Sequence, residues 1–310
     1  MGYKLAGYTH LGGVEIDEKV SMVYKQNHNP KYLYTEDIRK FNTRTDLPDE
    51  LYQLDILDGS PPCTTFSMAG DREKSWGKKK VFNEGQKEQT LDDLVFEYIN
   101  TIKKLQPKVA ILENVAGIIR GNAKLYAKRI HDMLSCTGYE VQVFLLNAAS
   151  MEVPQNRERV FFIARQKALN WLPLKLQYNY ATIPFSKVID WTDKENRLSE
   201  YQYALWLKRT KKDKSFGDII MHTEHRLSMF NNSIIHRDKP APTLVSSNGV
   251  MSLYDIPRPL NIKEIIQIAT FPEDYNFYGV SAQYIVGMSV PPVMMAHVAY
   301  DIYKQWFENR

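Results

Sequence analysis

The chain has 310 residues, an apolar fraction of 44% and a formal net charge of +4 at pH 7. This length allows one large domain or two. No run of about 18 apolar residues is evident, so no transmembrane helix is expected, and a signal-peptide pattern is absent. The two cysteines, Cys63 and Cys136, exclude a disulfide framework and a cysteine-based zinc site. We therefore expect a cytoplasmic protein without a metal site.

Apolar runs and helical periodicity alternate over residues 1–165. The pattern predicts strands near 9–16, 54–58, 108–113, 140–147 and 159–165, and helices near 18–27, 90–105 and 122–136. This alternation is typical of an α/β fold. It is lost over 166–235, and 291–307 then predicts a closing helix. We therefore expect a discontinuous large domain, 1–165 plus 236–310, and a smaller region, 166–235.

A stiff turn carries the first cysteine. The sequence Ser60-Pro61-Pro62-Cys63 follows a short apolar run that predicts a buried strand. Two prolines fix φ and remove backbone donors, so the turn is rigid and the thiol is aimed, as a nucleophile requires. The alternative is that Cys63 is a small buried apolar residue, as most intracellular cysteines are.

Two further groups of charged residues lie at strand ends. Glu113 ends the apolar run 109–112, and the carboxyl ends of strands in an open α/β sheet are where ligands bind. The alternative for Glu113 is a helix cap or a solvated acid. Arg157 and Arg159 precede the run 160–164, and alternate residues of an extended segment point the same way. They could hold a carbonyl or a phosphate, or form an ordinary charged strand edge.

These three blocks, in this order, resemble the signature motifs of the bacterial and phage cytosine-5 DNA methyltransferase family. Further matches are Val14-Glu15-Ile16-Asp17, Glu36-Asp37-Ile38, Asp238-Lys239-Pro240-Ala241-Pro242-Thr243-Leu244 and Gly287-Met288-Ser289-Val290-Pro291-Pro292. The resemblance covers nearly the whole chain, with a variable gap at 166–235. It implies a Rossmann-like S-adenosylmethionine-dependent methyltransferase sheet with a small target-recognition domain, for which 166–235 is the candidate.

The resemblance also implies a reaction. The Cys63 thiolate would add to C6 of a cytosine flipped out of double-stranded DNA, which activates C5 to accept the methyl group of S-adenosylmethionine. Glu113 would be protonated or share a proton with N3 of the base. Arg159 would hold the O2 side of the base, with support from Arg157. The base that removes the C5 proton is not evident and is either a side chain or a water.

A cofactor cleft is implied by the same resemblance. Glu15 would take the ribose hydroxyls, Ile16 would line the adenine and Asp37 would receive the adenine amino group. The other candidate cofactor residues are Ile38, Pro62, Leu91, Ser289 and Val290. Two departures stand out. Met288 replaces the usual Asn, and the family's first glycine-rich turn is not found. We therefore expect the chain to begin about one strand and one turn late, which would leave unpaired edges on two neighbouring strands.

A basic stretch follows the thiol turn and is the candidate DNA contact. Its residues are Ser67, Arg72, Lys74, Lys78, Lys79 and Lys80. Basic side chains there could close over a phosphate backbone, or form a plain solvated loop. A second basic cluster, 208–214, is open to the same two interpretations. Double-stranded DNA is the expected partner, with a cognate restriction endonuclease as a possible second one. RNA methylation and an inactive nucleic-acid-binding remnant are the alternatives.

Overall fold

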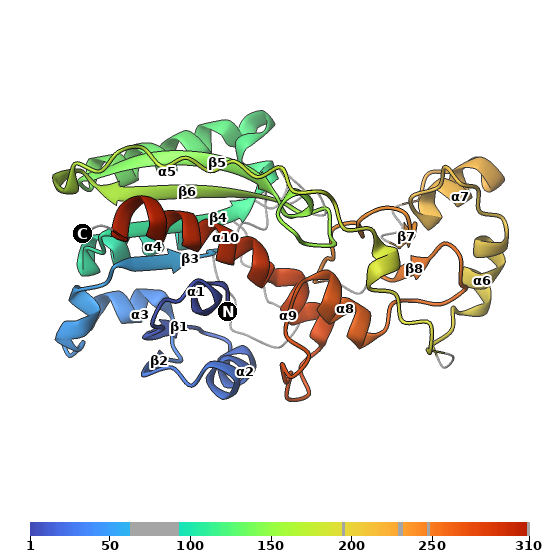
Figure 1. Cartoon of the computed structure of the whole chain (residues 1–310), viewed down its shortest axis with the longest axis horizontal. Coiled ribbons are helices and arrows are strands. Elements are labelled where there is room, and N and C mark those ends of the chain that lie inside the picture. The colour runs from blue at the N-terminus through green and yellow to red at the C-terminus, as the bar shows by residue number, and fades with distance from the viewer. Residues whose placement is uncertain (63–92, 194–195, 229–231, 247–248, 309–310) are drawn as a thin grey trace.

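A four-stranded sheet forms the centre of the larger lobe in this computed structural model, which describes residues 1–62, 93–193, 196–228, 232–246 and 249–308 (Figure 1). The strands are β3 (Ile56–Gly59), β4 (Val109–Val115), β5 (Tyr139–Asn147) and β6 (Glu158–Gln166), in the order β3-β4-β6-β5. β3 runs parallel to β4, and β6 runs antiparallel to both β4 and β5. β4 is buried almost throughout, as a central strand covered on both faces should be.

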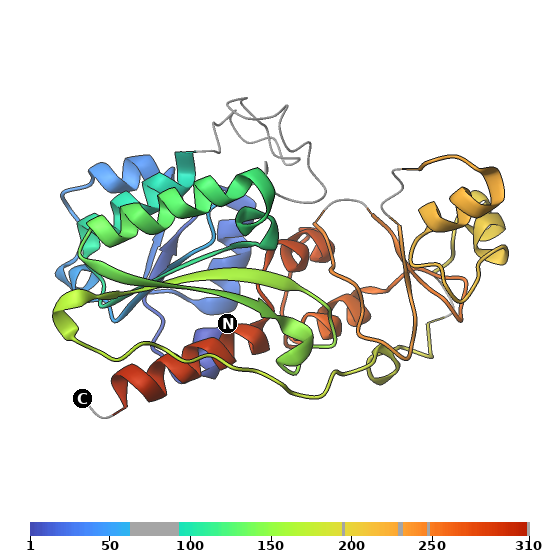
Figure 2. The same cartoon turned by 90° about the horizontal axis from the view of Figure 1, so that it is seen from above.

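Helices cover both faces of this sheet, as Figure 2 shows. They are α4 (Leu94–Leu105) and α5 (Lys124–Cys136) on one face, and α1 (Gly2–Leu5) and α10 (Pro292–Ile302) on the other. Val95, Ile99 and Ile102 are spaced at helical intervals along α4. They pack into the hydrophobic core on this face of the sheet, which we call the first core. α10 packs Val298, Ala299 and Ile302 into the second core, on the opposite face. The predicted strands and helices of this lobe are thus present, with boundaries shifted by a few residues.

A separate two-stranded sheet lies beside the first. It pairs β1 (Gly12–Val14) with β2 (Tyr32–Tyr34) in parallel, and is accompanied by α2 (Glu18–His28) and α3 (Ile38–Thr43). α2 docks against the C-terminal part of the chain, where Val23 packs with Val280 and Ile285. Within the described residues, no hydrogen-bonded ladder joins β1 to β3, so each of these strands has a single neighbour.

The smaller lobe is built from short elements. They are α6 (Glu200–Leu207), α7 (Phe216–Glu224), β7 (Ser233–Ile235), β8 (Met251–Leu253), α8 (Ile262–Ile268) and α9 (Ala282–Met288). Short 3-10 turns in the described part of the chain include Asp49–Tyr52, Ala116–Ile119, Gly121–Ala123, Ala148–Ser150, Lys167–Leu169 and Phe185–Lys187, and a π-turn covers Tyr303–Phe307. Trp171 and Leu174 pack into the core of the larger lobe, whereas Phe185 packs into the smaller one. The segment after β6 therefore begins in the larger lobe and has passed into the smaller one by Phe185.

One stretch, Ala282–Phe307, is long and apolar enough by composition to cross a membrane. It spans α9 and α10, and 56% of its most apolar window is buried inside the protein. Met294, Val298 and Ile302 are inaccessible to solvent because they pack under the sheet. The apolar character of this stretch is accounted for by its place in the core.

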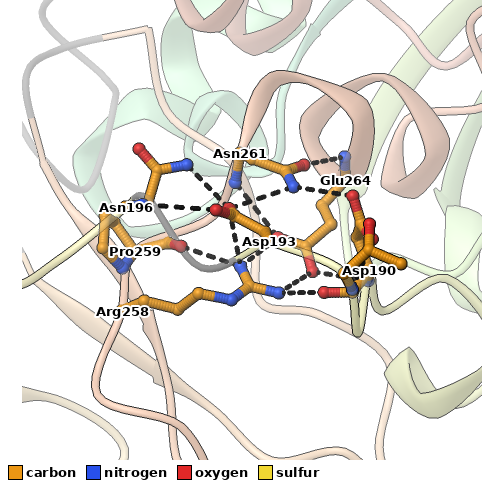
Figure 3. A network of polar contacts seen from close by, with 8 residues as sticks. Asp190, Asp193, Asn196, Arg258, Pro259, Asn261 and Glu264 are labelled. Carbon is orange, nitrogen blue, oxygen red and sulfur yellow. Dashed lines mark hydrogen bonds and ion pairs between the residues drawn. The ribbon is translucent and has the colours of Figure 1, made fainter.

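A buried ionic network ties the smaller lobe together (Figure 3). The Nη1 and Nη2 groups of Arg258 each donate to one carboxylate oxygen of Glu264, at 2.8 Å, and both side chains are almost inaccessible. Arg258 also donates to the carbonyl oxygen of Asp190 at 2.6 Å. Asn261 caps α8 and donates to Asp190 and Asp193. The network fastens the segment that leads into α6 to the start of α8.

Candidate active site

An acid and an arginine meet where β4 ends and β6 begins. Because the two strands are antiparallel, the last residues of β4 lie opposite the first residues of β6, with Val115 facing Arg159 and Glu113 facing Phe161. Glu113 and Arg159 are therefore diagonal neighbours on one face of the sheet, within reach of long side chains. Their Oε1 and Nε atoms lie 2.8 Å apart. The side chains are only 11% and 12% exposed.

The ion pair is held in a fixed orientation. Nη1 of Arg159 donates to the carbonyl oxygen of Glu158 at 2.7 Å, which fixes the plane of the guanidinium. Burial lowers the pKa of Arg159, and the adjacent Glu113 carboxylate works in the opposite direction. Among the described residues, Oε2 of Glu113 has no polar partner. One carboxylate oxygen of Glu113 is thus committed to Arg159.

The turn that leads to Cys63 is anchored beside this pair. Nδ2 of Asn114 donates to the carbonyl oxygen of Pro61 at 3.2 Å, and its Oδ1 accepts from the N–H of Val115. Asn114 is buried, so this contact is shielded from water. The edge strand β3 and the central strand β4 are in this way joined beyond the end of their ladder.

The Tyr98 side chain joins β3 to β4. The Tyr98 hydroxyl group lies 2.9 Å from the carbonyl oxygen of Leu57 and 2.8 Å from that of Ile111. Its ring packs so closely on Gly59 that an added Cβ would lie 2.5 Å from a ring carbon. Glycine is therefore required at this position by space. Burial raises the pKa of Tyr98 well above its usual value, in keeping with a structural role.

Arg157 does not join the ion pair. Its Nη1 donates to the carbonyl oxygen of Leu244 at 2.8 Å and its Nη2 to that of Gly287 at 2.7 Å. The residue is 1% exposed, and burial lowers its pKa to about 9. The alternation of residues in an extended strand predicts that Arg157 and Arg159 act together. In the structure Arg157 precedes β6 and contacts two distant backbone segments instead.

The candidate cofactor residues divide between two parallel strand ends. Glu15 follows β1, and its Oε1 accepts from the N–H of Asp17 at 2.8 Å. Burial raises the pKa of Glu15. Asp37 follows β2, caps α3 and pairs with Arg39 at 3.2 Å. Because β1 and β2 are parallel, both carboxylates lie at the same edge, where a ribose and an adenine could be held.

The remaining predicted cofactor residues have varied surroundings. Ile38 begins α3 and packs against the first core, and Val290 packs against the second. The Ser289 hydroxyl group donates to the carbonyl oxygen of Ile285 at 2.7 Å. Ile16 and Pro62 are half-buried. The residues fit the cofactor at Glu15, a carboxylate at a strand end that could accept hydrogen bonds from hydroxyl groups, and at Asp37, whose surface partner Arg39 is readily displaced.

Several predicted residues lie outside the described residues, and the structure places none of them. These are Cys63, Ser67, Arg72, Lys74, Lys78, Lys79, Lys80 and Leu91. In the described ranges, no group of three or more His, Cys, Asp or Glu side chains is placed to hold a metal ion.

Three supporting residues were given no role from the sequence: Asn114, Tyr98 and Gln155. Asn114 belongs to the motif Glu113-Asn114-Val115, and Gln155 begins the motif Gln155-Asn156-Arg157-Glu158-Arg159, but neither motif indicates what these amides contact. Tyr98 lies among the apolar residues of α4 and gives no sign of its hydroxyl partners. Gln155 is buried, and its Oε1 accepts from the N–H of Leu244, which is 89 residues away in the chain. Contacts of such range leave no local pattern.

Comparison with known proteins gives a consistent result. The family described as C-5 cytosine-specific DNA methylase matches residues 1–304. Type II methyltransferase M1.HphI of Haemophilus parahaemolyticus is 26% identical over 319 residues, which cover 98% of this chain and 83% of the relative.

Two solved structures share the fold. A proposed DNA modification methyltransferase encoded within an E. coli prophage superposes with a TM-score of 0.68 at 17% identity, covering 98% of this chain and 94% of its own. A mutant of Spodoptera frugiperda DNMT2 superposes with a TM-score of 0.66 at 16% identity, covering 97% and 95% of the two chains. At these identities the likeness concerns the fold alone, which is that of a Rossmann-like methyltransferase.

Proposed function

Because the chain belongs to the C-5 cytosine-specific DNA methylase family, we propose that it transfers a methyl group from S-adenosylmethionine to C5 of a flipped-out cytosine in double-stranded DNA. The observation that carries this proposal is the buried Glu113–Arg159 pair, 2.8 Å apart, next to the Pro61 turn that leads to Cys63. A nucleophile, a proton donor and a cation at one sheet edge are what the reaction needs.

In the first step, the Cys63 thiolate forms a bond to C6 of the cytosine. The electron pair of the C5–C6 double bond moves through the ring, and N3 takes up a proton. Oε2 of Glu113, which has no partner among the described residues, is the atom we assign to hold that proton. Arg159 keeps Oε1 in place and offers its remaining N–H groups to the O2 atom of the base, where negative charge would otherwise build up.

In the second step, the activated C5 takes the methyl group. S-adenosylmethionine would supply that methyl group from its sulfonium and would leave as S-adenosylhomocysteine. A base then removes the C5 proton, the C5–C6 double bond reforms, and the Cys63 thiolate leaves. The cofactor supplies an electrophilic methyl group; Glu15 and Asp37 are the side chains that would hold its ribose and adenine.

Access to the base requires extrusion from the helix, because C6 and C5 are stacked inside a duplex. We propose that region 166–235, which contributes α6 and α7 to the smaller lobe, contacts the DNA around the extruded base. The basic residues after Cys63 would contact phosphates. A restriction endonuclease of the same specificity is the protein partner we infer, since the relative M1.HphI is named a Type II methyltransferase.

The test is methyl transfer from S-adenosylmethionine labelled in its methyl group. The chain is incubated with unmethylated double-stranded DNA and, separately, with transfer RNA. A Cys63→Ser variant and DNA containing 5-fluorocytosine complete the set. Fluorine at C5 cannot leave as a proton does, so the covalent adduct should persist on a denaturing gel with the native protein and be absent with Cys63→Ser.

Label at C5 of cytosine in DNA supports the proposal. Label in transfer RNA without label in DNA would assign the chain to the RNA alternative. Label in neither, with DNA still bound, would favour the inactive nucleic-acid-binding alternative. Transfer at the native rate by Cys63→Ser would refute the adduct mechanism.

A further inference from the structure

Three chain segments converge just before β6. The Asn156 N–H donates to the carbonyl oxygen of Ala241 at 2.7 Å, and the Thr243 hydroxyl group donates to the carbonyl oxygen of Asn156 at 2.7 Å. The N–H of Leu244 donates to Oε1 of Gln155. Segment 241–246 is thereby held along residues 154–157. Segment 241–246 lies between β7 and β8 of the smaller lobe, so these contacts join that lobe to the start of β6.

Arg157 joins the third segment to these two. Its forked guanidinium reaches the carbonyl oxygen of Leu244 with one arm and that of Gly287 with the other. The two acceptors are 43 residues apart in the chain, since they lie 87 and 130 residues from Arg157. A planar fork with fixed angles can hold two backbones at a set separation, and a lysine ammonium cannot.

The burial of this charge is costly. Among the described residues, no carboxylate forms an ion pair with Arg157, and its Nε has no hydrogen-bond partner. Burying a cation without a counter-ion is strongly unfavourable, and an apolar side chain could fill the same space without that cost. We therefore infer that Arg157 does more than fill space.

The third segment leads into the candidate cofactor residues Ser289 and Val290. Gly287 lies so close to segment 241–246 that an added Cβ would be 2.5 Å from the N atom of Ser246. The position of this turn is therefore set by two contacts: backbone against backbone at Gly287, and the hydrogen bond from Arg157. A change in either of these two contacts would move Ser289 and Val290.

We propose that Arg157 is a positioning residue for methyl transfer. It sets the cofactor turn, 287–290, at a fixed place relative to Arg159, which lies two residues further along the chain, in β6. This rests on the proposed function, because it takes 287–290 as part of the cofactor site. Arg157 itself touches neither the base nor the cofactor; it maintains the separation between the two sites across which the methyl group must pass.

The test compares Arg157→Lys with Arg165→Lys. Arg165 is another buried arginine, located near the C-terminal end of β6, where it pairs with Glu140. The measured quantities are the Kd for S-adenosylhomocysteine by calorimetry, KM for S-adenosylmethionine, kcat, and the temperature of unfolding. We expect Arg157→Lys to raise both the Kd and the KM by about 10- to 100-fold, because small misplacements have effects of that size. Arg165→Lys should lower the unfolding temperature and leave the Kd and KM at native values.

Gly287→Ala provides a second variant that keeps the buried charge and its partners. It presses the turn away from segment 241–246 and should raise the same Kd and KM, whatever the stability of Arg157→Lys. A native Kd in both Arg157→Lys and Gly287→Ala would overturn the positioning role. If the native protein binds no S-adenosylhomocysteine, the proposed function fails, and this inference fails with it.

Discussion

The Oε1 atom of Glu113 lies 2.8 Å from the Nε atom of Arg159, across the antiparallel pair β4–β6. The register makes this contact possible, because residues opposite and diagonal in antiparallel strands share one face. A buried charge pair of this kind contributes little net stability, since desolvation offsets the attraction. Its value lies in orientation, because it presents one carboxylate oxygen and one edge of a guanidinium to the same space.

Glu113→Gln should lower the single-turnover rate of methyl transfer by about 10²- to 10⁴-fold, the usual range for losing a positioned proton donor. The amide keeps the shape of the side chain and cannot transfer a proton to N3. Glu158→Gln is the matched control: this carboxylate is 41% exposed and pairs with Arg120 at the surface. An unchanged rate in Glu113→Gln would remove Glu113 from its proposed role.

Asn114→Ala should slow formation of the covalent adduct and leave cofactor affinity unchanged. The substitution removes the hydrogen bond to the Pro61 carbonyl and leaves that half-buried oxygen without this partner. The turn carrying Cys63 then loses its link to β4, and misplacement of a nucleophile has a large effect on rate. Trapping with 5-fluorocytosine DNA measures the rate of adduct formation. Asn100→Ala, on the exposed side of α4, is the control; equal trapping rates in both variants would contradict the role.

The sequence predicted the α/β larger lobe well and the supporting contacts poorly. β4 and α4 carry strong signals, because one is a buried apolar run and the other has an apolar face at helical spacing. β2 has three residues and was not predicted. Glu113 was identified as a candidate because it ends a buried strand. The partners of Arg157 lie 87 and 130 residues away, so they follow from tertiary packing and leave no local trace.

Glu15→Gln should stabilise the protein at neutral pH and weaken cofactor binding. Burial raises the pKa of Glu15, so the folded protein retains a proton that the unfolded chain has already released. Stability therefore falls as pH rises from the unfolded pKa, about 4.3, through the raised folded pKa. The neutral amide avoids this penalty, with an expected gain of about 1 kcal/mol at neutral pH. Denaturant titrations at several pH values measure the free energy of unfolding of the native protein and of Glu15→Gln. An equal pH dependence in the two proteins would contradict the prediction.

Breaking the Arg258–Glu264 pair should unfold or loosen the smaller lobe. Glu264→Gln leaves a buried guanidinium without its bidentate carboxylate, and removing one partner of a buried pair costs about 3–5 kcal/mol. Arg258→Met and Glu264→Leu together should cost less than the sum of the single changes, because neither member of this pair is left without the other. The control pair in the same lobe is Arg237–Asp255, 3.6 Å apart and exposed, whose loss should cost less than about 1 kcal/mol. Denaturant unfolding of Glu264→Gln, of the two single changes, of the double variant and of a variant of the control pair measures these costs. Additive losses at Arg258 and Glu264 would show that the two side chains act independently, and the network would then not fasten residues 190–193 to α8.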